Sequence, residues 1–428
     1  MLPARKRQKC NWVWNALLGI GICTLLAVLA YQIPWVHQRA SWRLEAAVNY
    51  IRLSIHPVGT VPIPDETLPA LVSSEIVPTP TATIPPTSTP STPEPTPTVT
   101  PSPTPLPTSV TLSPPVFDKS KDIQDWNNCG PATLALYLRF YGWQGDQFTI
   151  SDVVKPLRAD KNVNIDELQY FVLTQAGWLG AEFRVGGTIP LLKEFIAAGF
   201  PIMIEESFLI GEEYWPNDDH WTGHYLLLTG YDDANGTFIS QDAFKGPNTL
   251  KSYRDLDKDW EAFNRVYMIV FPTQQVDTIK AILGSDWDKE VNRQHALDTA
   301  QASTISNPDD AFAWFNLGTN LAYFDKYSEA AQAYDQSFKI GLPQRMLRYQ
   351  FGPFIVDFKL DRNDDLLSLT KYALNLTPNS EEILLWRGWA LYRNGDREEA
   401  LKAINDALVA HPGYSDALYA LDYINKNP

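Results

Sequence analysis

The sequence predicts an α+β domain followed by an all-α array of helical repeats, with an apolar N-terminal helix and a Pro/Thr-rich segment ahead of them. Between residues 116 and 275, amphipathic helical patterns come first and strand patterns follow, which is typical of an α+β layout. From residue 276 to 428, glycines and prolines recur at separations of 34 to 36 residues, as in helical repeats. Fourteen of the 33 prolines lie in residues 78–115.

The N-terminus resembles a membrane anchor. Residues 1–11 form a basic tail, and residues 12–36 carry no charged side chain over a length that can span a bilayer as a helix. Basic residues stay on the cytoplasmic side, so we expect a single-pass protein of the cell membrane with a cytoplasmic N-terminus and extracytoplasmic C-terminal domains. The competing interpretation is a cleaved signal peptide, with Val28-Leu29-Ala30 as its cleavage site.

Residues 37–77 form a juxtamembrane segment, and residues 78–115 predict a disordered linker of Pro, Thr and Ser. Proline lacks the N–H donor of helices and sheets, and this composition cannot bury a core. We expect an extended spacer that holds the next domain away from the membrane, although such tracts also serve as docking ligands.

Net charge and motifs exclude several function classes. The net charge of −15 argues against a nucleic-acid-binding protein. The chain has no Gly-x-x-x-x-Gly-Lys-Ser/Thr sequence, so it carries no such nucleotide-binding loop. We expect no cofactor and no metal site.

Cys129 precedes Gly130-Pro131 at the start of an apolar helical pattern. Proline suits the first helical turn, so the cysteine sulfur is expected at a helix N-terminus, where partial positive charge favours the thiolate. The other cysteines, Cys10 and Cys23, lie beside or within the apolar segment, so an intrachain disulfide to Cys129 is not expected. The plain alternative is a small apolar residue at a helix start.

Residues that could activate this thiol follow in order. His224 opens an apolar strand and Asp242 closes the next, one hairpin away, so the register can place both at the same end of a sheet. Gln124, five residues before Cys129, could direct its amide N–H at a developing oxyanion. His220 is a rival base in a polar loop, and His220 and His224 on one strand would lie about 13 Å apart, too far to share a metal ion.

These residues resemble the papain-like cysteine peptidases, within them the bacterial bacteriocin-processing peptidases and their C39-like relatives. The resemblance covers about residues 120–272. It rests on Gln124, on Cys129-Gly130-Pro131-Ala132, on Gly223-His224-Tyr225 with the apolar strand after it, and on Asp242. It implies that Cys129 is the nucleophile, His224 the general base and acid, Asp242 its orienting partner and Gln124 part of the oxyanion hole. Ala243 follows Asp242 where the family often has proline.

Residues 276–428 resemble tetratricopeptide repeats (TPRs). The best copies contain Trp314-Phe315-Asn316-Leu317-Gly318 and Trp386-Arg387-Gly388, and we expect four stacked units, of which the first, with Gly284, and the third are degenerate. Such arrays often present a groove for a peptide or protein partner; a scaffold or dimerisation module is the alternative.

The sequence therefore predicts a membrane-anchored, extracytoplasmic cysteine peptidase that acts on a peptide or protein substrate, with repeats that bind a protein partner. The alternative is a catalytically inactive peptidase-like domain that serves as a surface scaffold. Acyl transfer or peptidoglycan-amide cleavage on the same residues is a third possibility.

Overall fold

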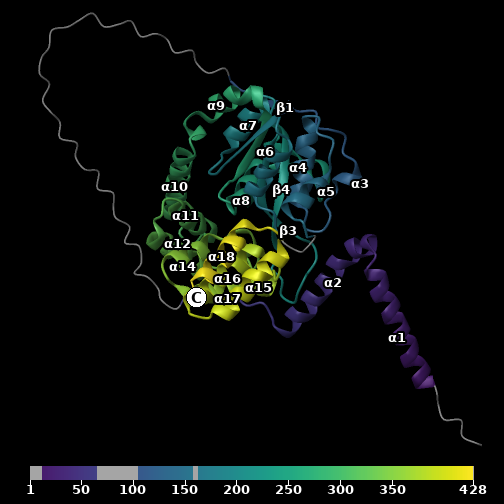
Figure 1. Cartoon of the computed structure of the whole chain (residues 1–428). Coiled ribbons are helices and arrows are strands. Elements are labelled where there is room, and N and C mark those ends of the chain that lie inside the picture. Colours follow the sequence, from purple (N-terminus) through teal and green to yellow (C-terminus); the bar gives the residue numbers. More distant parts are fainter. Residues whose placement is uncertain (1–11, 65–104, 158–161, 428) are drawn as a thin grey trace, which may run out of the picture.

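The computed structural model describes residues 12–64, 105–157 and 162–427 (Figure 1). Within this part of the chain, an α+β domain built around one sheet is followed by a helical region, and two helices precede both. This order agrees with the predicted α+β domain followed by helical repeats.

The N-terminal helices are α1 (Trp12–Tyr31) and α2 (Pro34–Ile55). The sequence predicts one continuous helix over residues 12–36, but in the structure the helix is interrupted between Tyr31 and Pro34. Proline disfavours helical geometry in the residue before it, and Ile33 is accordingly extended, with φ −73° and ψ 121°. Among the residues that the structure describes, no helix combines the length and the apolar character needed to cross a membrane.

Helix α2 lies against the helical region near the C-terminus. The Arg52 guanidinium donates to the Asn375 carbonyl at 2.5 Å, and the Asn379 amide donates to Glu45 at 2.6 Å. The Leu53 side chain is fully buried. The segment predicted only as juxtamembrane, residues 37–77, therefore contains most of a helix that is packed on the folded body.

The sheet is entirely antiparallel, with strand order β2-β7-β3-β4-β5-β6 and β1 paired to β4. The strands are β1 (Ser109–Thr111), β2 (Leu179–Arg184), β3 (Ile202–Leu209), β4 (Trp221–Asp232), β5 (Thr237–Asp242), β6 (Gly246–Ser252) and β7 (Tyr267–Pro272).

Strand β1 lies inside the predicted linker, residues 78–115. Of that linker, residues 78–104 lie outside the described residues, whereas Val110 pairs with Tyr231 and the Tyr231 hydroxyl donates to the Pro107 carbonyl at 2.7 Å. The boundary predicted at residue 116 therefore falls after the first strand. The composition did not reveal this because a three-residue strand takes its hydrogen bonds from β4 rather than from local sequence.

Helices cover both faces of the sheet, because successive side chains of the central strands point to opposite faces and both sets include apolar residues. Met203 and Leu227 face α4 (Cys129–Phe140), α5 (Gln147–Val154) and α6 (Ile165–Gln175). Ile202 and Leu226 face the opposite side, towards α7 (Ile189–Ala197), α8 (Tyr253–Glu261) and α9 (Val276–Leu283). Short α3 (Lys119–Asp122) precedes α4. Because both faces are covered, the central strands are apolar along most of their length.

The helical region comprises α10 (Lys289–Ser306), α11 (Ala311–Tyr323), α12 (Tyr327–Ile340), α13 (Met346–Tyr349), α14 (Gly352–Lys359), α15 (Asn363–Leu376), α16 (Glu381–Arg393), α17 (Arg397–Ala410) and α18 (Ser415–Lys426). Its glycines allow paired helices to approach closely: a Cβ on Gly318 would lie 2.8 Å from the Tyr334 ring, and one on Gly388 would lie 2.6 Å from Ile404.

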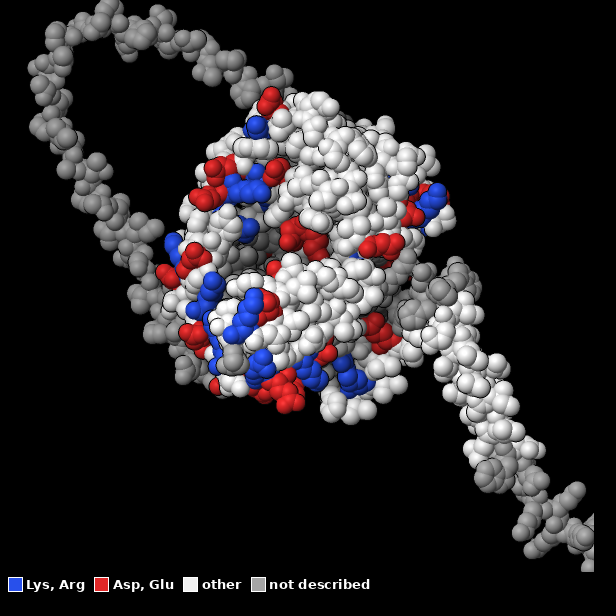
Figure 2. Space-filling model, in the orientation of Figure 1, with Lys and Arg blue, Asp and Glu red and all other residues white. Residues whose placement is uncertain are grey.

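On the face in Figure 2, Lys and Arg side chains lie among Asp and Glu side chains over these helices.

The first predicted repeat differs from the structure. Gly284 has φ +55° and ends α9, so it is a helix-terminating residue rather than a helix-packing one. Ile279 and Leu283 of α9 belong to the core beneath the sheet. The α+β domain therefore extends past the predicted boundary at residue 275.

Candidate active site

Cys129 begins helix α4. The first N–H groups of a helix have no intrahelical acceptor and carry partial positive charge, which favours a thiolate there. Gly130 lets this end of the helix approach the sheet, because a Cβ would lie 3.3 Å from both the Leu168 side chain and the Tyr225 ring. Pro131 occupies the first turn, where its missing N–H has no cost. The Cys-Gly-Pro sequence thus places the sulfur directly above strand β4.

His224 and Asp242 lie on the neighbouring strands β4 and β5, and their register puts both side chains at the same end of the sheet. His224 Nε2 and Asp242 Oδ1 are 2.9 Å apart, and the two side chains are only 4% and 3% exposed. Asp242 Oδ1 also accepts the backbone N–H groups of Phe244 at 2.7 Å and Lys245 at 3.1 Å. These bonds orient the carboxylate, and the carboxylate orients the imidazole.

The electrostatics favour a charged pair between Cys129 and His224, because each side chain shifts the pKa of the other towards its charged form. Burial raises the pKa of the Cys129 thiol, but His224, a backbone hydrogen bond from Tyr225 and the charge of Lys155 outweigh it and lower that pKa below its ordinary value. Burial lowers the pKa of His224, but Asp242 and Cys129 outweigh it and raise that pKa to about 9. Because Nε2 faces Asp242, Nδ1 is the ring nitrogen left for the thiol.

Gln124 reaches the same site from the loop before α4. Its side chain lines one cavity together with Cys129 and His224. Its backbone N–H donates to the Ala243 carbonyl at 2.8 Å, which holds the residue beside the end of β5. The structure therefore brings together Gln124, Cys129, His224 and Asp242, the four residues predicted from the sequence; their catalytic roles stay a prediction.

A residue that the sequence analysis missed holds the loop ahead of Cys129. The Gln147 carbonyl oxygen accepts the Asp125 N–H at 2.8 Å and the Asn128 side-chain amide at 2.9 Å. Its amide nitrogen donates to the carbonyls of Lys121 and Ile123, both at 2.8 Å. Gln147 has no local motif, and only its burial in the folded domain identifies it.

The cavity at the site has a volume of about 330 Å³ and takes its walls from three parts of the chain. The α+β domain supplies most of them; α2 contributes Ala46 and Asn49, and the helical region contributes Tyr349 and Leu376. The aromatic residues in the walls are Trp126, Phe208, Tyr214, Trp215, Phe244 and Tyr349. These aromatic walls favour a ligand with apolar groups.

The rival residues have other partners. The His220 ring Nδ1 lies 3.2 Å from the Ile210 carbonyl, and His220 does not line the cavity. Two acidic residues near the site, Glu205 and Glu206, are buried in β3. Glu205 accepts the Tyr225 hydroxyl at 3.0 Å, and Glu206 pairs with Lys251 at 2.9 Å.

A protein-family model matches the part of the chain that carries this site. Residues 114–268 match the Peptidase_C39 like family. This part of the chain is a peptidase C39-like domain. The C39-like domain is joined to the TPR-like helical region that the repeats at Gly318 and Gly388 had indicated.

Several solved structures resemble a part of the chain. A putative C39-like peptidase from Bacillus anthracis has a TM-score of 0.31 and 16% identity, covering 38% of this chain and 97% of that one. Xylellain, a cysteine protease from Xylella fastidiosa, has a TM-score of 0.30 and 16% identity, covering 38% and 86%. YrrB, described as a TPR protein with an unusual peptide-binding site, has a TM-score of 0.29 and 20% identity, covering 35% and 74%. No curated protein matches the chain.

Proposed function

We propose that the C39-like domain is an active cysteine peptidase that cleaves an amide bond in a peptide or protein. The observation that supports this most directly is His224, which pairs with Asp242, lowers the pKa of Cys129 and lines the same cavity as that thiol, a cavity large enough for a peptide segment. A nucleophile, its base and an orienting acceptor are the parts that covalent amide hydrolysis needs.

The reaction proceeds in two steps. The Cys129 thiolate attacks the amide carbon and forms a C–S bond, while the carbonyl oxygen becomes an oxyanion. The Gln124 side chain and the Cys129 backbone N–H are the donors available to that oxyanion. Protonated His224 transfers its proton to the leaving nitrogen as the C–N bond breaks, which leaves a thioester.

Water completes the cycle. Neutral His224 removes a proton from the water molecule that attacks the thioester, the C–S bond breaks, and the thiolate–imidazolium pair is restored with release of the carboxylic acid. Asp242 keeps the imidazole oriented through both steps, because its own position is held by two backbone N–H groups.

The test is Cys129→Ala in the full chain, assayed on a peptide library and by mass spectrometry of the products. We expect complete loss of cleavage without change in the thermal unfolding midpoint, because the substitution is small and lies at a helix start. Ala in place of His224 should also abolish cleavage and remove the acid-tolerant alkylation of Cys129.

The inactive-scaffold alternative makes the opposite prediction. Cys129 would then react with alkylating reagents like an ordinary thiol, and His224→Ala would not change the pH at which it reacts. Cleavage that persists at the wild-type rate in Cys129→Ala would contradict the proposal directly.

Two further parts of the proposal concern partners and location. We propose that the TPR-like region binds a protein partner, which co-purification with and without residues 289–427 would test. The location with a cytoplasmic N-terminus and extracytoplasmic domains is likewise a proposal. Protease digestion of intact cells would test it, since protected C-terminal domains would contradict it.

A further inference from the structure

The loop between β3 and β4, residues 210–220, forms one wall of the active-site cavity. Ile210, Tyr214 and Trp215 line the cavity together with Cys129. The loop leads directly into β4, three residues before His224. Its conformation therefore determines the shape of the space in front of the nucleophile.

The loop backbone is held in a conformation that needs support. Asn217 and His220 have φ +64° and +61°, in the left-handed region that costs a residue with a side chain about 1 kcal/mol or more. The Asp218 carboxylate gathers the loop, because it accepts the backbone N–H groups of Tyr214 and His220, both at 2.9 Å. The partner of this carboxylate therefore controls the loop.

That partner comes from the TPR-like region. The Arg345 guanidinium binds both oxygens of Asp218, at 2.5 Å and 2.6 Å, and donates to the Trp221 carbonyl at 3.1 Å. The Asp218 and Arg345 side chains are 0% and 5% exposed. The guanidinium also stacks over the Trp215 ring, 3.9 Å from its centroid. The Arg345 side chain thus contacts Asp218 within the loop, Trp221 directly after it, and Trp215 in the cavity wall.

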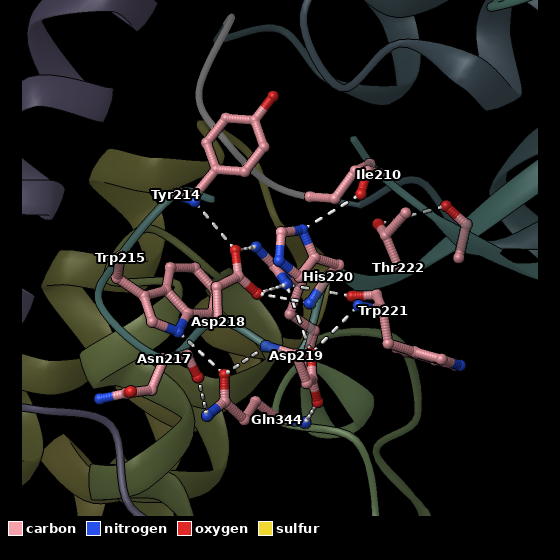
Figure 3. A network of polar contacts seen from close by, with 12 residues as sticks. Ile210, Tyr214, Trp215, Asn217, Asp218, Asp219, His220, Trp221, Thr222 and Gln344 are labelled. Carbon is pink, nitrogen blue, oxygen red and sulfur yellow. Dashed lines mark hydrogen bonds and ion pairs between the residues drawn. The ribbon is translucent and has the colours of Figure 1, made fainter. Parts of the chain in front are cut away.

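Gln344 adds a second set of contacts. The Gln344 side-chain oxygen Oε1 accepts the Trp215 indole N–H at 2.8 Å, and its side-chain nitrogen Nε2 donates to the Asn217 carbonyl at 3.1 Å (Figure 3). The Gln344 backbone N–H donates to the Asp219 carboxylate at 2.6 Å. The Tyr372 hydroxyl of α15 donates to the Gln344 carbonyl at 3.0 Å, which anchors this segment in the helical region.

We infer that Arg345 and Gln344 are positioning residues of the peptidase: they hold the loop of residues 210–220, and Trp215 above all, in the place where it forms a wall of the substrate cleft. The helical region is therefore a structural part of the site. This inference rests on the proposed function, but it concerns substrate access and not the chemical step.

The test compares two alkylating reagents on Cys129 in the full chain. Iodoacetamide is small and reports the reactivity of the thiolate, whereas a dipeptidyl chloromethyl ketone with an aromatic residue must occupy the cleft. We expect Arg345→Met to slow the peptidyl reagent about tenfold and to leave the iodoacetamide rate within about twofold. Hydrogen exchange at residues 210–220 should increase in parallel. If a cleaved peptide is known, its KM should rise with kcat nearly unchanged.

The matched control is Arg362→Met. Arg362 also makes buried ion pairs in the helical region, with Asp335, Asp357 and Asp365, but contacts nothing in the loop. Equal slowing by this control would show that Arg345 acts only through the stability of the helical region, and would overturn the inference. Arg345→Lys, which keeps the charge but loses the two-oxygen geometry, should give an intermediate rate.

Gln344→Ala covers the case in which Arg345→Met does not fold, because it removes hydrogen bonds without leaving a buried charge. It should slow the peptidyl reagent and spare iodoacetamide. Unchanged rates for both reagents in Gln344→Ala and Arg345→Met would refute the inference. If the variants react more slowly with the peptidyl reagent but the wild-type chain cleaves no peptide, the proposed function is refuted and the positioning role of Arg345 and Gln344 still holds.

Discussion

Replacing Asp242 with Asn keeps the shape of the side chain and removes the charge that faces His224. The pKa of His224 stands at about 9, raised from 6.5, and Asp242 is the largest cause that raises it. One pKa unit corresponds to about 1.4 kcal/mol, so the surroundings stabilise the protonated imidazole by about 3 kcal/mol. Cys129 supplies part of this, so we expect Asp242→Asn to lower the pKa of His224 by roughly one to two pH units.

The sign follows from which form each residue needs. The thiolate–imidazolium pair exists above the lowered pKa of Cys129 and below the raised pKa of His224. A lower His224 pKa therefore moves the alkaline limb of kcat/KM to lower pH. Loss of the imidazolium also raises the pKa of Cys129, so its alkylation by iodoacetamide should begin at higher pH.

The assay is the pH dependence of both rates between about pH 4 and about pH 10, a range that includes the pKa of about 9 of His224. Asp255→Asn is the control, because Asp255 is exposed on α8 and has no contact with the site. Wild-type limbs in Asp242→Asn would refute the reasoning, since they would mean that the charge of Asp242 does not set the protonation of His224.

Three further predictions concern the cavity and the helices. Gln124→Ala should lower kcat by about a hundredfold and leave Cys129 alkylation by iodoacetamide unchanged, because an oxyanion donor acts only in the transition state; an unchanged kcat would exclude that role. Leu53→Asp should detach α2 from the folded body, because a carboxylate would replace the buried Leu53 side chain. Since α2 lines the cavity, the reaction of Cys129 with large peptidyl reagents should become faster; a slower reaction would contradict this and mean that α2 helps to bind substrate. Gly318→Ala should destabilise the helical region by about 1–3 kcal/mol in urea unfolding, because its Cβ would lie 2.8 Å from the Tyr334 ring, and an unchanged midpoint would contradict this packing.

Local patterns predicted the parts of the protein that depend on local chemistry. Cys129 before Gly130-Pro131 indicated a thiol at a helix start, because proline and the helix N-terminus impose their preferences within a few residues. The hairpin spacing between His224 and Asp242 predicted their proximity, since antiparallel strands return to the same edge. Repeating glycines predicted close helix pairs at Gly318 and Gly388.

Local patterns were misleading where the decisive contacts lie far apart in the chain. Gly284 has the spacing of a repeat but ends α9, because its backbone conformation is set by the sheet core against which α9 packs. Strand β1 lies in a segment with the composition of a linker, because β4 supplies its hydrogen bonds.

The amino-acid sequence by itself predicted which residues meet at the candidate site, because each lies at or near the end of an element whose start and period can be read locally. Only the tertiary structure decided what encloses them. Arg345 and Asp218 are 127 residues apart, and neither belongs to a motif. An Arg and an Asp that pair in the interior have no sequence signature, because only the fold brings them together and removes water from both. The same packing brings residues of the TPR-like region into the walls of the cavity around Cys129.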